Sequence, residues 1–345
     1  MISLDYEICL LTGKNKNYWD EFLLKNESAT FFHQTGWKEA VESTYGHKPY
    51  YLVAGNRDAL LGILPMFFLH NRFFGKRLIS VPFAPYGGAC SQILDVKEAL
   101  IDEAIRIGKE LDVDYCEFRR LGNSDEKISQ YNYYSTFRLN LSRGKNYIWD
   151  NLDRKVRNMI RKGEKNNLEF RIDSARTSIN EFYDIYSRNM KYLGTPVHNI
   201  SFFYNILEAF REKVLIAKAL WKGETISSLF LANFNSSLTS CWGSSLKDFQ
   251  GYAPTDFIYW NSIKFACANN ILWFDFGRSP VNSGNYKFKK HWGSLEIPLI
   301  YSYFPRRTKL EPPQQVKYNQ FAVAWSYLPL TVTKIIGPKI RKFIP

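Results

Sequence analysis

Apolar and polar positions follow the same order twice along the chain. In the first half, apolar runs at 50–54, 59–69 and 77–81 are separated by turn residues and predict three strands. Residues 96–111 carry apolar side chains at helical spacing, which predicts a helix with one buried face. Residues 114–118 follow as a short closing strand.

The second half repeats this order. Strands are predicted at 214–221, 225–234 and 238–242, a helix at 257–268 and a closing strand at 271–276. The two closing strands align without a gap, Glu117-Phe118-Arg119-Arg120 with Asp275-Phe276-Gly277-Arg278. We interpret this as an internal duplication of roughly 160 residues. The alternative is that a common strand and helix arrangement occurs twice by coincidence.

Helical segments precede each repeat, at 37–45 in the first half and at 152–165, 179–192 and 202–210 in the second. Strands that alternate with helices and are mostly joined by hairpins predict a mixed α/β (α+β) protein with two sheets. We expect an N-terminal domain at 1–145, a C-terminal domain at 146–305 and a separate tail at 306–345.

The tail differs in composition from the rest of the chain. It contains eight Lys or Arg residues and one Glu, so it supplies +7 of the net charge of +13. Apolar residues such as Phe321, Trp325 and Ile336 are interspersed with these cations. This pattern is typical of a helix that lies on an anionic membrane. Docking of the tail on the protein's own surface is the alternative.

Charge and composition narrow the function classes. A net charge of +13 favours an anionic partner, either nucleic acid, a phosphorylated lipid or sugar, or a membrane surface. Five cysteines without a CxxC pair and five scattered histidines predict neither a disulfide framework nor a metal site. The sequence shows no signal peptide and no apolar stretch of membrane-spanning length. We therefore expect a cytoplasmic protein, with peripheral contact at the inner face of the plasma membrane as a further expectation for the tail.

The first candidate for chemistry is the basic segment 154–165. Its apolar stripe is narrow and six cations fill its remaining positions. A helix of this kind presents a dense positive face to phosphate, so Arg157, Arg161 and Lys162 are candidate substrate ligands. An ordinary solvated face is the alternative.

The second candidate follows the last predicted strand. Asp275 and Arg278 lie at the end of that strand, ahead of a loop with glycines at 284 and 293 and three lysines between them. A carboxylate and cations at a strand end are often found at the mouth of a site, and the ammonium groups could stabilise an oxyanion or bind phosphate. A purely structural Asp275–Arg278 ion pair is the alternative.

Other side chains could complete such a site. Tyr86, Trp242 and Tyr286 are candidate walls of a cleft, although aromatic residues more often lie in a core. Asp256 and Asp275 are the carboxylates nearest to the candidate loops and are candidates for a general base. The sequence contains no G-x-S-x-G motif and no recognisable Cys/His setting, which argues against a nucleophilic hydrolase.

These segments carry a family resemblance over roughly residues 30–305. The motifs are Phe32-His33-Gln34-x-x-Trp37, Pro82-Phe83-x-x-Tyr86-Gly87-Gly88, Arg157-Asn158-x-Ile160-Arg161-Lys162, Gly194-Thr195-Pro196-x-His198, Phe274-Asp275-Phe276-Gly277-Arg278-Ser279 and Gly284-x-Tyr286-x-Phe288-Lys289-Lys290-x-Trp292-Gly293. Together they resemble the Fem-like acyltransferases of the GNAT-related group. That group includes peptidoglycan bridge aminoacyltransferases and exopolysaccharide-associated relatives, and the sequence is more similar to the latter.

The resemblance implies two tandem GNAT-like domains, each a mixed, largely antiparallel sheet flanked by helices. It implies an enzyme that forms an amide on an amine of a cell-envelope or exopolysaccharide precursor, without a metal or a covalent intermediate. The family's Phe-Lys pair falls on Phe288 and Lys289, so Lys289 is the leading active-site residue. No cofactor is expected to be tightly bound. Acyl-CoA, an acyl carrier and aminoacyl-tRNA stay open as donors, since the chain lacks the usual pyrophosphate loop of acetyl-CoA-dependent relatives. A non-catalytic adaptor of a polysaccharide-synthesis system, docked on anionic membrane, is the alternative.

Overall fold

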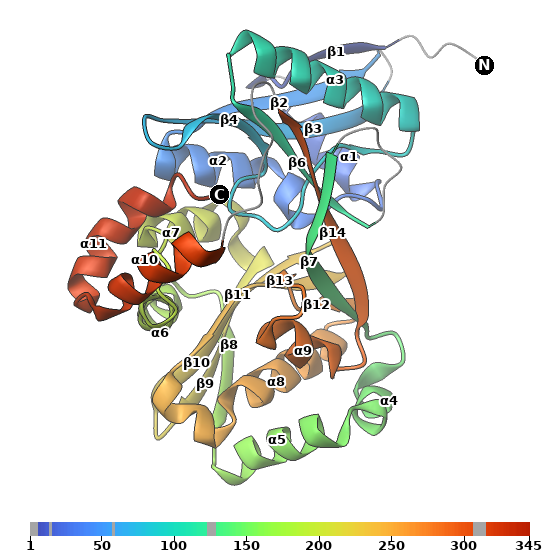
Figure 1. The fold of residues 1–345 in the computed structure, drawn as a ribbon. Coiled ribbons are helices and arrows are strands. Elements are labelled where there is room, and N and C mark those ends of the chain that lie inside the picture. Colours follow the sequence, from blue (N-terminus) through green and yellow to red (C-terminus); the bar gives the residue numbers. More distant parts are fainter. Residues whose placement is uncertain (1–5, 14–15, 57–58, 123–128, 306–314) are drawn as a thin grey trace. The chain divides into compact units, whose positions relative to one another are not determined.

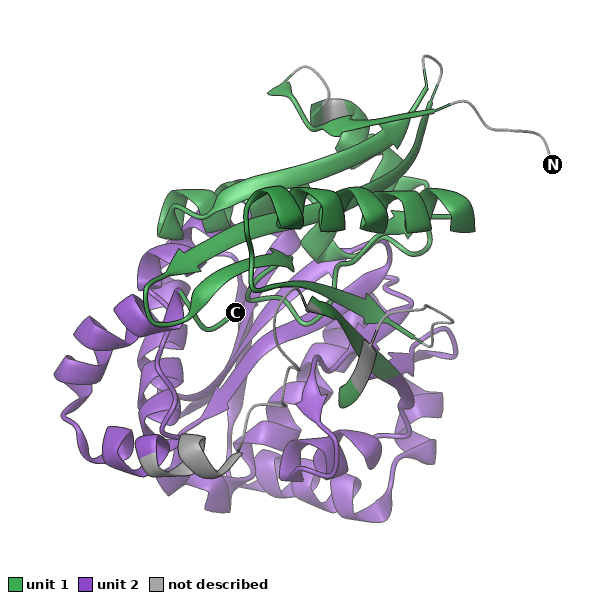
Figure 2. Cartoon of the chain, turned by 45° about the horizontal axis from the view of Figure 1, so that its top comes forward, with its two compact units in different colours: residues 1–133, 298–312, 343–345 green, residues 134–297, 313–342 purple. Residues whose placement is uncertain are grey.

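The computed structural model describes residues 6–13, 16–56, 59–122, 129–305 and 315–345 (Figure 1). The chain divides into two compact units (Figure 2). Unit 1 contains Met1–Tyr133, Pro298–Pro312 and Phe343–Pro345, and unit 2 contains Tyr134–Ile297 and Pro313–Lys342. Neither unit is one continuous segment, because the chain returns to unit 1 after residue 297.

Unit 1 is a mainly antiparallel sheet with helices on both faces. The strand order is β1-β2-β3-β4-β6-β14, and β5 pairs with β3. Its elements are β1 (Glu7–Leu10), α1 (Lys16–Leu24), α2 (Thr35–Tyr45), β2 (Lys48–Gly55), β3 (Leu60–Asn71), β4 (Gly75–Ser80), β5 (Cys90–Ser91), α3 (Leu94–Glu110), β6 (Tyr115–Leu121) and, from residue 298 onwards, β14 (Leu295–Pro305). Side chains alternate between the faces of a strand. Tyr50 and Leu52 of β2 accordingly pack in the core beneath α3, while Tyr51 contacts Trp19 of α1 on the other face.

Unit 2 has the same layered arrangement. The strand order is β7-β12-β11-β10-β9-β8, and β13 pairs with β7. Its elements are β7 (Ser129–Asn140), α4 (Gly144–Asn151), α5 (Arg154–Lys165), β8 (Glu169–Asp173), α6 (Arg176–Tyr192), α7 (Ile200–Phe210), β9 (Val214–Trp221), β10 (Glu224–Phe234), β11 (Ser237–Ser245), α8 (Pro254–Ala268), β12 (Trp273–Asp275), β13 (Ser279–Pro280), α9 (Gly284–Lys290), α10 (Gln315–Tyr327) and α11 (Leu330–Arg341). Helix α8 covers one face through Ile258 and Ile263, and α6 covers the other through Phe182, which contacts Phe230.

The two units repeat one topology, as the sequence predicts. Three antiparallel strands, a helix and a parallel closing strand appear as β2-β3-β4-α3-β6 and as β9-β10-β11-α8-β12. The last parallel pair is Ile79↔Glu117 in unit 1 and Thr239↔Asp275 in unit 2. Glu117 and Asp275 therefore occupy the same position in the two sheets, which confirms the predicted alignment of the closing strands.

The structure corrects two local expectations. The segment expected to be a glycine-punctuated loop contains helix α9, which begins after Ser283, whose hydroxyl accepts a hydrogen bond from the Tyr286 N–H at 3.2 Å. Strands β7 and β14 were not anticipated from the apolar pattern. β7 is rich in polar and tyrosine residues and β14 contains two prolines, and both strands gain their partners from segments far away in sequence.

The described part of the tail packs on unit 2. The backbone of Gly194, just after α6, lies so close to α10 that an added Cβ would be 2.5 Å from the Ala322 Cβ, and Trp325 is buried. The Lys191 ammonium donates a hydrogen bond to the Ser326 carbonyl at 2.8 Å. The tail thus docks on the protein's own surface. Among the described residues, no helix is both long enough and apolar enough to cross a membrane.

Candidate functional site

The candidate site lies where β11 and β12 stop pairing. The two strands run parallel from Ser237↔Trp273 to Thr239↔Asp275. β12 ends there, while β11 continues to Ser245 past a bulge next to Trp242. Main-chain and side-chain groups after Asp275 are therefore not held by this pairing, and strand ends of this kind are where α/β proteins place their sites.

Asp275 is buried at the start of a tight turn. Its Oδ1 accepts hydrogen bonds from the Gly277 N–H at 2.8 Å and from the Thr136 hydroxyl on β7. Gly277 has φ +75°, and a Cβ there would lie 2.4 Å from the Ser240 carbonyl oxygen. Only glycine fits this position, because any side chain would collide with β11.

Lys289 is the residue of α9 that is buried. Its ammonium donates hydrogen bonds to the carbonyl oxygens of Gly277 at 2.8 Å and of Arg278 at 3.2 Å. Burial lowers the pKa of Lys289 to about 7; Asp275 opposes this shift and Arg278 adds to it. The lysine therefore holds the turn after β12 with a charge that is close to titrating at neutral pH.

The structure brings the three predicted catalytic residues together. Arg278 follows the turn held by Lys289, and its guanidinium lies 4.7 Å from the centroid of the Tyr134 ring. Ser279, the next residue, pairs with Ser135 of β7. Its buried hydroxyl has no hydrogen-bond partner among the described residues, so the cluster contains an unsatisfied polar atom.

Two predicted binding residues flank Lys289 on α9. Phe288 packs on Tyr259 of α8, with ring centroids 5.6 Å apart. The Tyr286 hydroxyl donates a hydrogen bond to Glu296 at 2.7 Å, and Ser135 donates to the other carboxylate oxygen at 2.8 Å. The side chains next to Lys289 in sequence therefore connect α9 to α8 and to Glu296.

Asp256 lies in the first turn of α8. It is one helical turn before Tyr259, so both side chains share a face of the helix, and Tyr259 contacts Phe288. Burial raises the pKa of Asp256 to about 6. A carboxylate with this pKa has the basicity expected of a general base that works near neutral pH.

The basic helix α5 packs on the same end of α8. An added Cβ on Gly163 would lie 2.7 Å from the Phe257 Cβ, next to Asp256. Lys162 and Arg161 are exposed, and the Arg161 guanidinium lies 5.4 Å from the Trp149 ring centroid. Arg157 is half-buried, and its buried Nε has no hydrogen-bond partner within the described ranges. Helix α5 thus carries three candidate cations, two of them exposed, and packs on α8 through Gly163.

Trp242 and Tyr86 are packed among core aromatics. Trp242 lies on the face of the unit 2 sheet that α6 and α7 cover, 5.2 Å from Phe203 and 5.3 Å from Phe230. Tyr86 belongs to unit 1, is 4% exposed and packs edge-on against Phe32 at 5.5 Å. Their contacts correspond to the core alternative, whereas Asp256, Tyr286 and Phe288 lie on the α8 and α9 side of the unit 2 sheet.

Sequence reasoning missed several polar residues of the cluster. Thr136, Ser135 and Glu296 contribute hydrogen bonds from β7 and β14, the two strands that the apolar pattern did not predict. The sequence contains only a weak indication of these residues, namely polar side chains within segments rich in aromatic residues.

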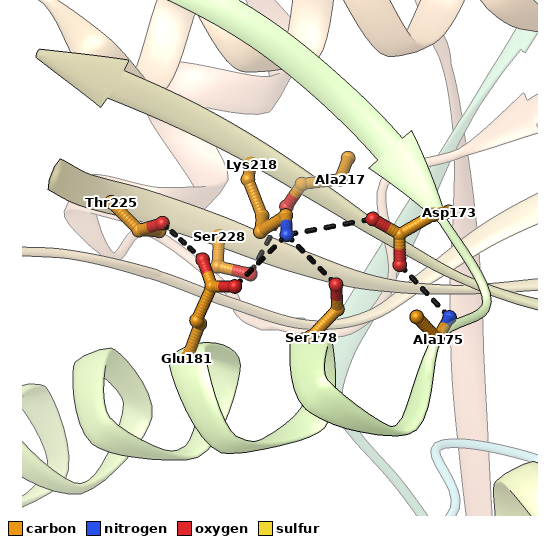
Figure 3. A network of polar contacts seen from close by, with 8 residues as sticks. All are labelled: Asp173, Ala175, Ser178, Glu181, Ala217, Lys218, Thr225 and Ser228. Atoms are coloured by element: carbon orange, nitrogen blue, oxygen red, sulfur yellow. Dashed lines mark hydrogen bonds and ion pairs between the residues drawn. The ribbon is translucent and has the colours of Figure 1, made fainter. Parts of the chain in front are cut away.

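A second polar cluster, around Lys218 of β9, was also not anticipated (Figure 3). The buried Lys218 ammonium lies 2.8 Å from Ser178 Oγ, 3.1 Å from Glu181 Oε1 and 3.4 Å from Asp173 Oδ2. Glu181 also accepts a hydrogen bond from the Thr225 hydroxyl at 2.6 Å. These contacts join α6 to the β8, β9 and β10 edge of the sheet, which is a structural role.

The described residues offer no metal site, and a cavity in unit 1 lies apart from the candidate site residues. Among the described residues, no group of three His, Cys, Asp or Glu side chains could hold a metal ion. A cavity of about 260 Å³ in unit 1 is lined by residues that include Cys9, Glu103 and Arg106, and by none of the candidate site residues.

Comparison with known proteins identifies the class of the second unit. Residues 151–290 match the family model described as an acetyltransferase (GNAT) domain. This segment is therefore a GNAT acyltransferase domain, which confirms the class of enzyme that the sequence motifs predict. The match includes α5, Asp256, Asp275, Arg278 and the whole of α9. A search of the curated proteins gave no match.

Solved structures are similar in fold over most of the chain. A crystal structure of FemX has a TM-score of 0.66 at 13% identity and covers 92% of this chain and 100% of its own. L-PGS from Bacillus licheniformis has a TM-score of 0.58 at 11% identity, with 92% and 98% coverage. A tandem GNAT protein from the clavulanic acid biosynthesis pathway has a TM-score of 0.56 at 8% identity, with 89% and 100% coverage. These similarities confirm the predicted α/β architecture of tandem GNAT-like domains.

Proposed function

We propose that unit 2 transfers an acyl or aminoacyl group to an amine at the cluster formed by Lys289, Asp275 and Arg278. The observation that carries the proposal is a buried ammonium at a strand end inside a GNAT acyltransferase domain. The amine attacks the carbonyl carbon of an activated ester or thioester and forms the C–N bond. The alcohol or thiol leaves, and the amine loses a proton to a base.

Each residue has a role in this reaction. An ammonium has three N–H donors, and two of those on Lys289 bind main-chain carbonyls, which leaves one for the oxyanion of the tetrahedral intermediate. Asp275 fixes the turn that Lys289 holds, and Phe288 and Tyr286 exclude water beside it. Asp256 is the proposed base, because its pKa of about 6 makes it available as a carboxylate at neutral pH.

The proposed acceptor is an amine of a phosphate-bearing precursor of the cell envelope or of an exopolysaccharide. The cations of α5 beside α8 favour an anionic substrate. The fold similarity to FemX and to L-PGS, together with the Fem-like motifs, supports an acyl or aminoacyl transfer of this kind. Aminoacyl-tRNA, acyl-CoA and an acyl carrier are the donors to be compared.

The first experiment tests the role of Lys289. The purified full chain is incubated with each donor class and an amine acceptor, and amide formation is followed by mass spectrometry. Lys289→Met should lower the turnover rate about 10²-fold or more, because it removes the charge nearest to the proposed oxyanion. Lys287→Met, an exposed lysine of the same helix, is the matched control and should retain full activity. Full activity of a folded Lys289→Met variant would overturn the role proposed for Lys289. Absence of amide formation by the wild-type protein with every donor class would favour the non-catalytic adaptor.

The second experiment separates the donors. Filter binding of charged tRNA at several salt concentrations should show a steep salt dependence if tRNA is the donor. The double variant Arg161→Gln/Lys162→Gln should then reduce the salt slope by about 2, since each lost phosphate contact contributes about 1. Arg171→Gln/Lys222→Gln removes two exposed cations elsewhere in unit 2 and should leave the slope unchanged. Absence of binding by the wild-type protein excludes tRNA and leaves acyl-CoA or an acyl carrier.

A further inference from the structure

The tail helices α10 and α11 bury some of their apolar residues and expose others. Their inner face is used by the protein itself: Trp325, Thr333 and Gly337 are buried. An added Cβ on Gly337 would lie 3.0 Å from Val197, so α11 approaches the chain after α6 closely. Arg341 donates a hydrogen bond from Nε to the buried His198 Nε2 at 3.1 Å. The inner face therefore explains how the tail is attached, and it leaves the exposed apolar residues without a role.

The outer face exposes large apolar side chains. The exposed fractions are 44% for Phe321, 58% for Val323, 84% for Tyr327, 63% for Ile335 and 41% for Ile336. Tyr192 and Leu193, which are 53% and 52% exposed, directly precede Gly194 and its contact with Ala322. Val323 and Tyr327 lie on the side of α10 opposite Trp325, whereas Phe321 stacks on Trp325 with ring centroids 5.5 Å apart. We call Val323, Tyr327, Ile335, Ile336, Tyr192 and Leu193 the outer tail patch. Exposed apolar groups gathered in this way mark an interaction surface, whereas single ones do not.

The charge around this patch indicates its partner. Residues 313–345 contain five Lys or Arg and no Asp or Glu. Lys339 is exposed on α11 beyond Ile335 and Ile336, and the Lys247 ammonium lies 4.4 Å from the centroid of the Tyr192 ring. Asp184, a carboxylate of α6 in contact with the tail, is bound by Lys334 and Arg188. Cations around an apolar and aromatic surface suit anionic headgroups over an acyl layer.

The dimensions of the tail suit a surface position. α10 has 13 residues and α11 has 12, and neither could span a bilayer. Both helices lie outside residues 151–290, the segment that matches the GNAT domain, so this domain does not account for them. We propose that the outer tail patch docks on the surface of an anionic phospholipid bilayer, with its apolar side chains at the acyl boundary and its lysines among the headgroups.

Vesicle flotation tests this inference. The full chain is mixed with vesicles of phosphatidylcholine alone or with added phosphatidylglycerol. It should float with the anionic vesicles only, and added salt should weaken the binding. The variant Tyr327→Ser/Ile335→Ser/Ile336→Ser should reduce the bound fraction about tenfold, because it removes the apolar contacts but no charge. Leu272→Ser, an exposed leucine outside the tail, is the matched control and should bind as the wild type does.

Three outcomes would overturn the inference. They are no binding to anionic vesicles, equal binding to neutral ones, and undiminished binding of a triple variant whose melting temperature is unchanged. A change in oligomeric state in the triple variant would show instead that a second copy of the chain covers the patch. Amide formation with a water-soluble acceptor is measured in parallel and should be unaffected, so the result is independent of the proposed catalytic cluster.

Discussion

The proposed reaction depends mainly on the charge of a single buried lysine. Lys289 is 7% exposed and donates hydrogen bonds to two main-chain carbonyls, so its charge is fixed in direction as well as in place. A charge held in this way needs no rearrangement when an oxyanion forms nearby. Burial, which lowers its pKa to about 7, also makes that charge dependent on pH.

The titration of Lys289 should determine how the turnover rate depends on pH. The ammonium is present below its pKa and is lost as the pH rises through about 7, so the turnover rate should fall on the alkaline side. In Lys289→Arg the guanidinium stays charged, and the alkaline fall should disappear even if the rate is lower throughout. A pH–rate profile for both proteins gives the answer. An unchanged alkaline limb in the arginine variant would assign that limb to another group.

The acid side of the same profile belongs to Asp256. Its carboxylate forms as the pH rises through about 6, so the rate should increase across this range if it is the base. Asp256→Asn is the companion variant and should lose the acid limb together with most of the activity.

The sequence indicated which candidate residues would lie together better than it indicated their surroundings. Lys289, Asp275 and Arg278 follow from motif and strand-end reasoning, and the structure brings them together. The packing of Trp242 did not follow, because an aromatic residue in a strand faces one side or the other according to register and bulges, and here a bulge lies next to it. The hydrogen bond from Thr136 was equally inaccessible, since it joins residues far apart in sequence.

At the scale of elements, segments with a strong apolar periodicity were predicted. Segments without that periodicity, or strands that pair only with distant parts of the chain, were missed. The helix expected at 96–111 is α3, Leu94–Glu110, because its apolar spacing is strong. α9 has only seven residues, a glycine at its start and three lysines, so it lacks a clear apolar stripe. Ser283 was the available signal, as a serine at this position caps a helix.

The contact between α6 and the sheet edge depends on Lys218. Lys218→Met should lower the free energy of unfolding by about 1–3 kcal/mol, because Glu181 and Asp173 lose a buried hydrogen-bonded partner. Urea unfolding measures this loss, with the exposed Lys155→Met as the control. A variant as stable as the wild type would show that the cluster contributes nothing net.

The stability that the Lys218 cluster contributes should depend on pH through Asp173. The pKa of Asp173 lies below its usual value: burial acts to raise it, and hydrogen bonds from Ser178, the Ala175 N–H and Lys218 outweigh that effect. A carboxylate of this kind stabilises the fold above its unfolded pKa of about 4 and loses the effect as the pH falls below it. The stability difference between the wild type and Lys218→Met should therefore shrink in acid.

For the whole molecule, the two repeats differ in how they bind the carboxylate at the end of the closing strand. In unit 1, Glu117 pairs with Arg119 on its own strand at 2.6 Å, and the guanidinium also donates to the Ala84 carbonyl at 2.8 Å. In unit 2, Gly277 takes the place of that arginine, and the cation arrives from α9 instead. The carboxylate of unit 1, Glu117, is thus bound by a buried arginine of its own strand, whereas that of unit 2, Asp275, is part of the candidate site.

Arg119→Met should consequently affect folding and leave the chemistry unchanged. Loss of the guanidinium leaves Glu117 buried without its partner, which costs about 3–5 kcal/mol. The folded fraction should keep the wild-type turnover rate, measured after correction for active protein, and the exposed Arg72→Met should change neither quantity. A stable but inactive Arg119→Met variant would instead assign unit 1 a part in the reaction.

The position of β14 has a consequence for biosynthesis. Residues Leu299–Pro305 pair along β6 of unit 1, although they are translated after all the strands of unit 2. While the ribosome makes the intervening segment, the free edge of β6 presents unpaired amide and carbonyl groups to the surrounding solution. The first part of the chain to emerge is therefore among the last to be completed, and the nascent protein has to keep that edge from associating with other chains until then.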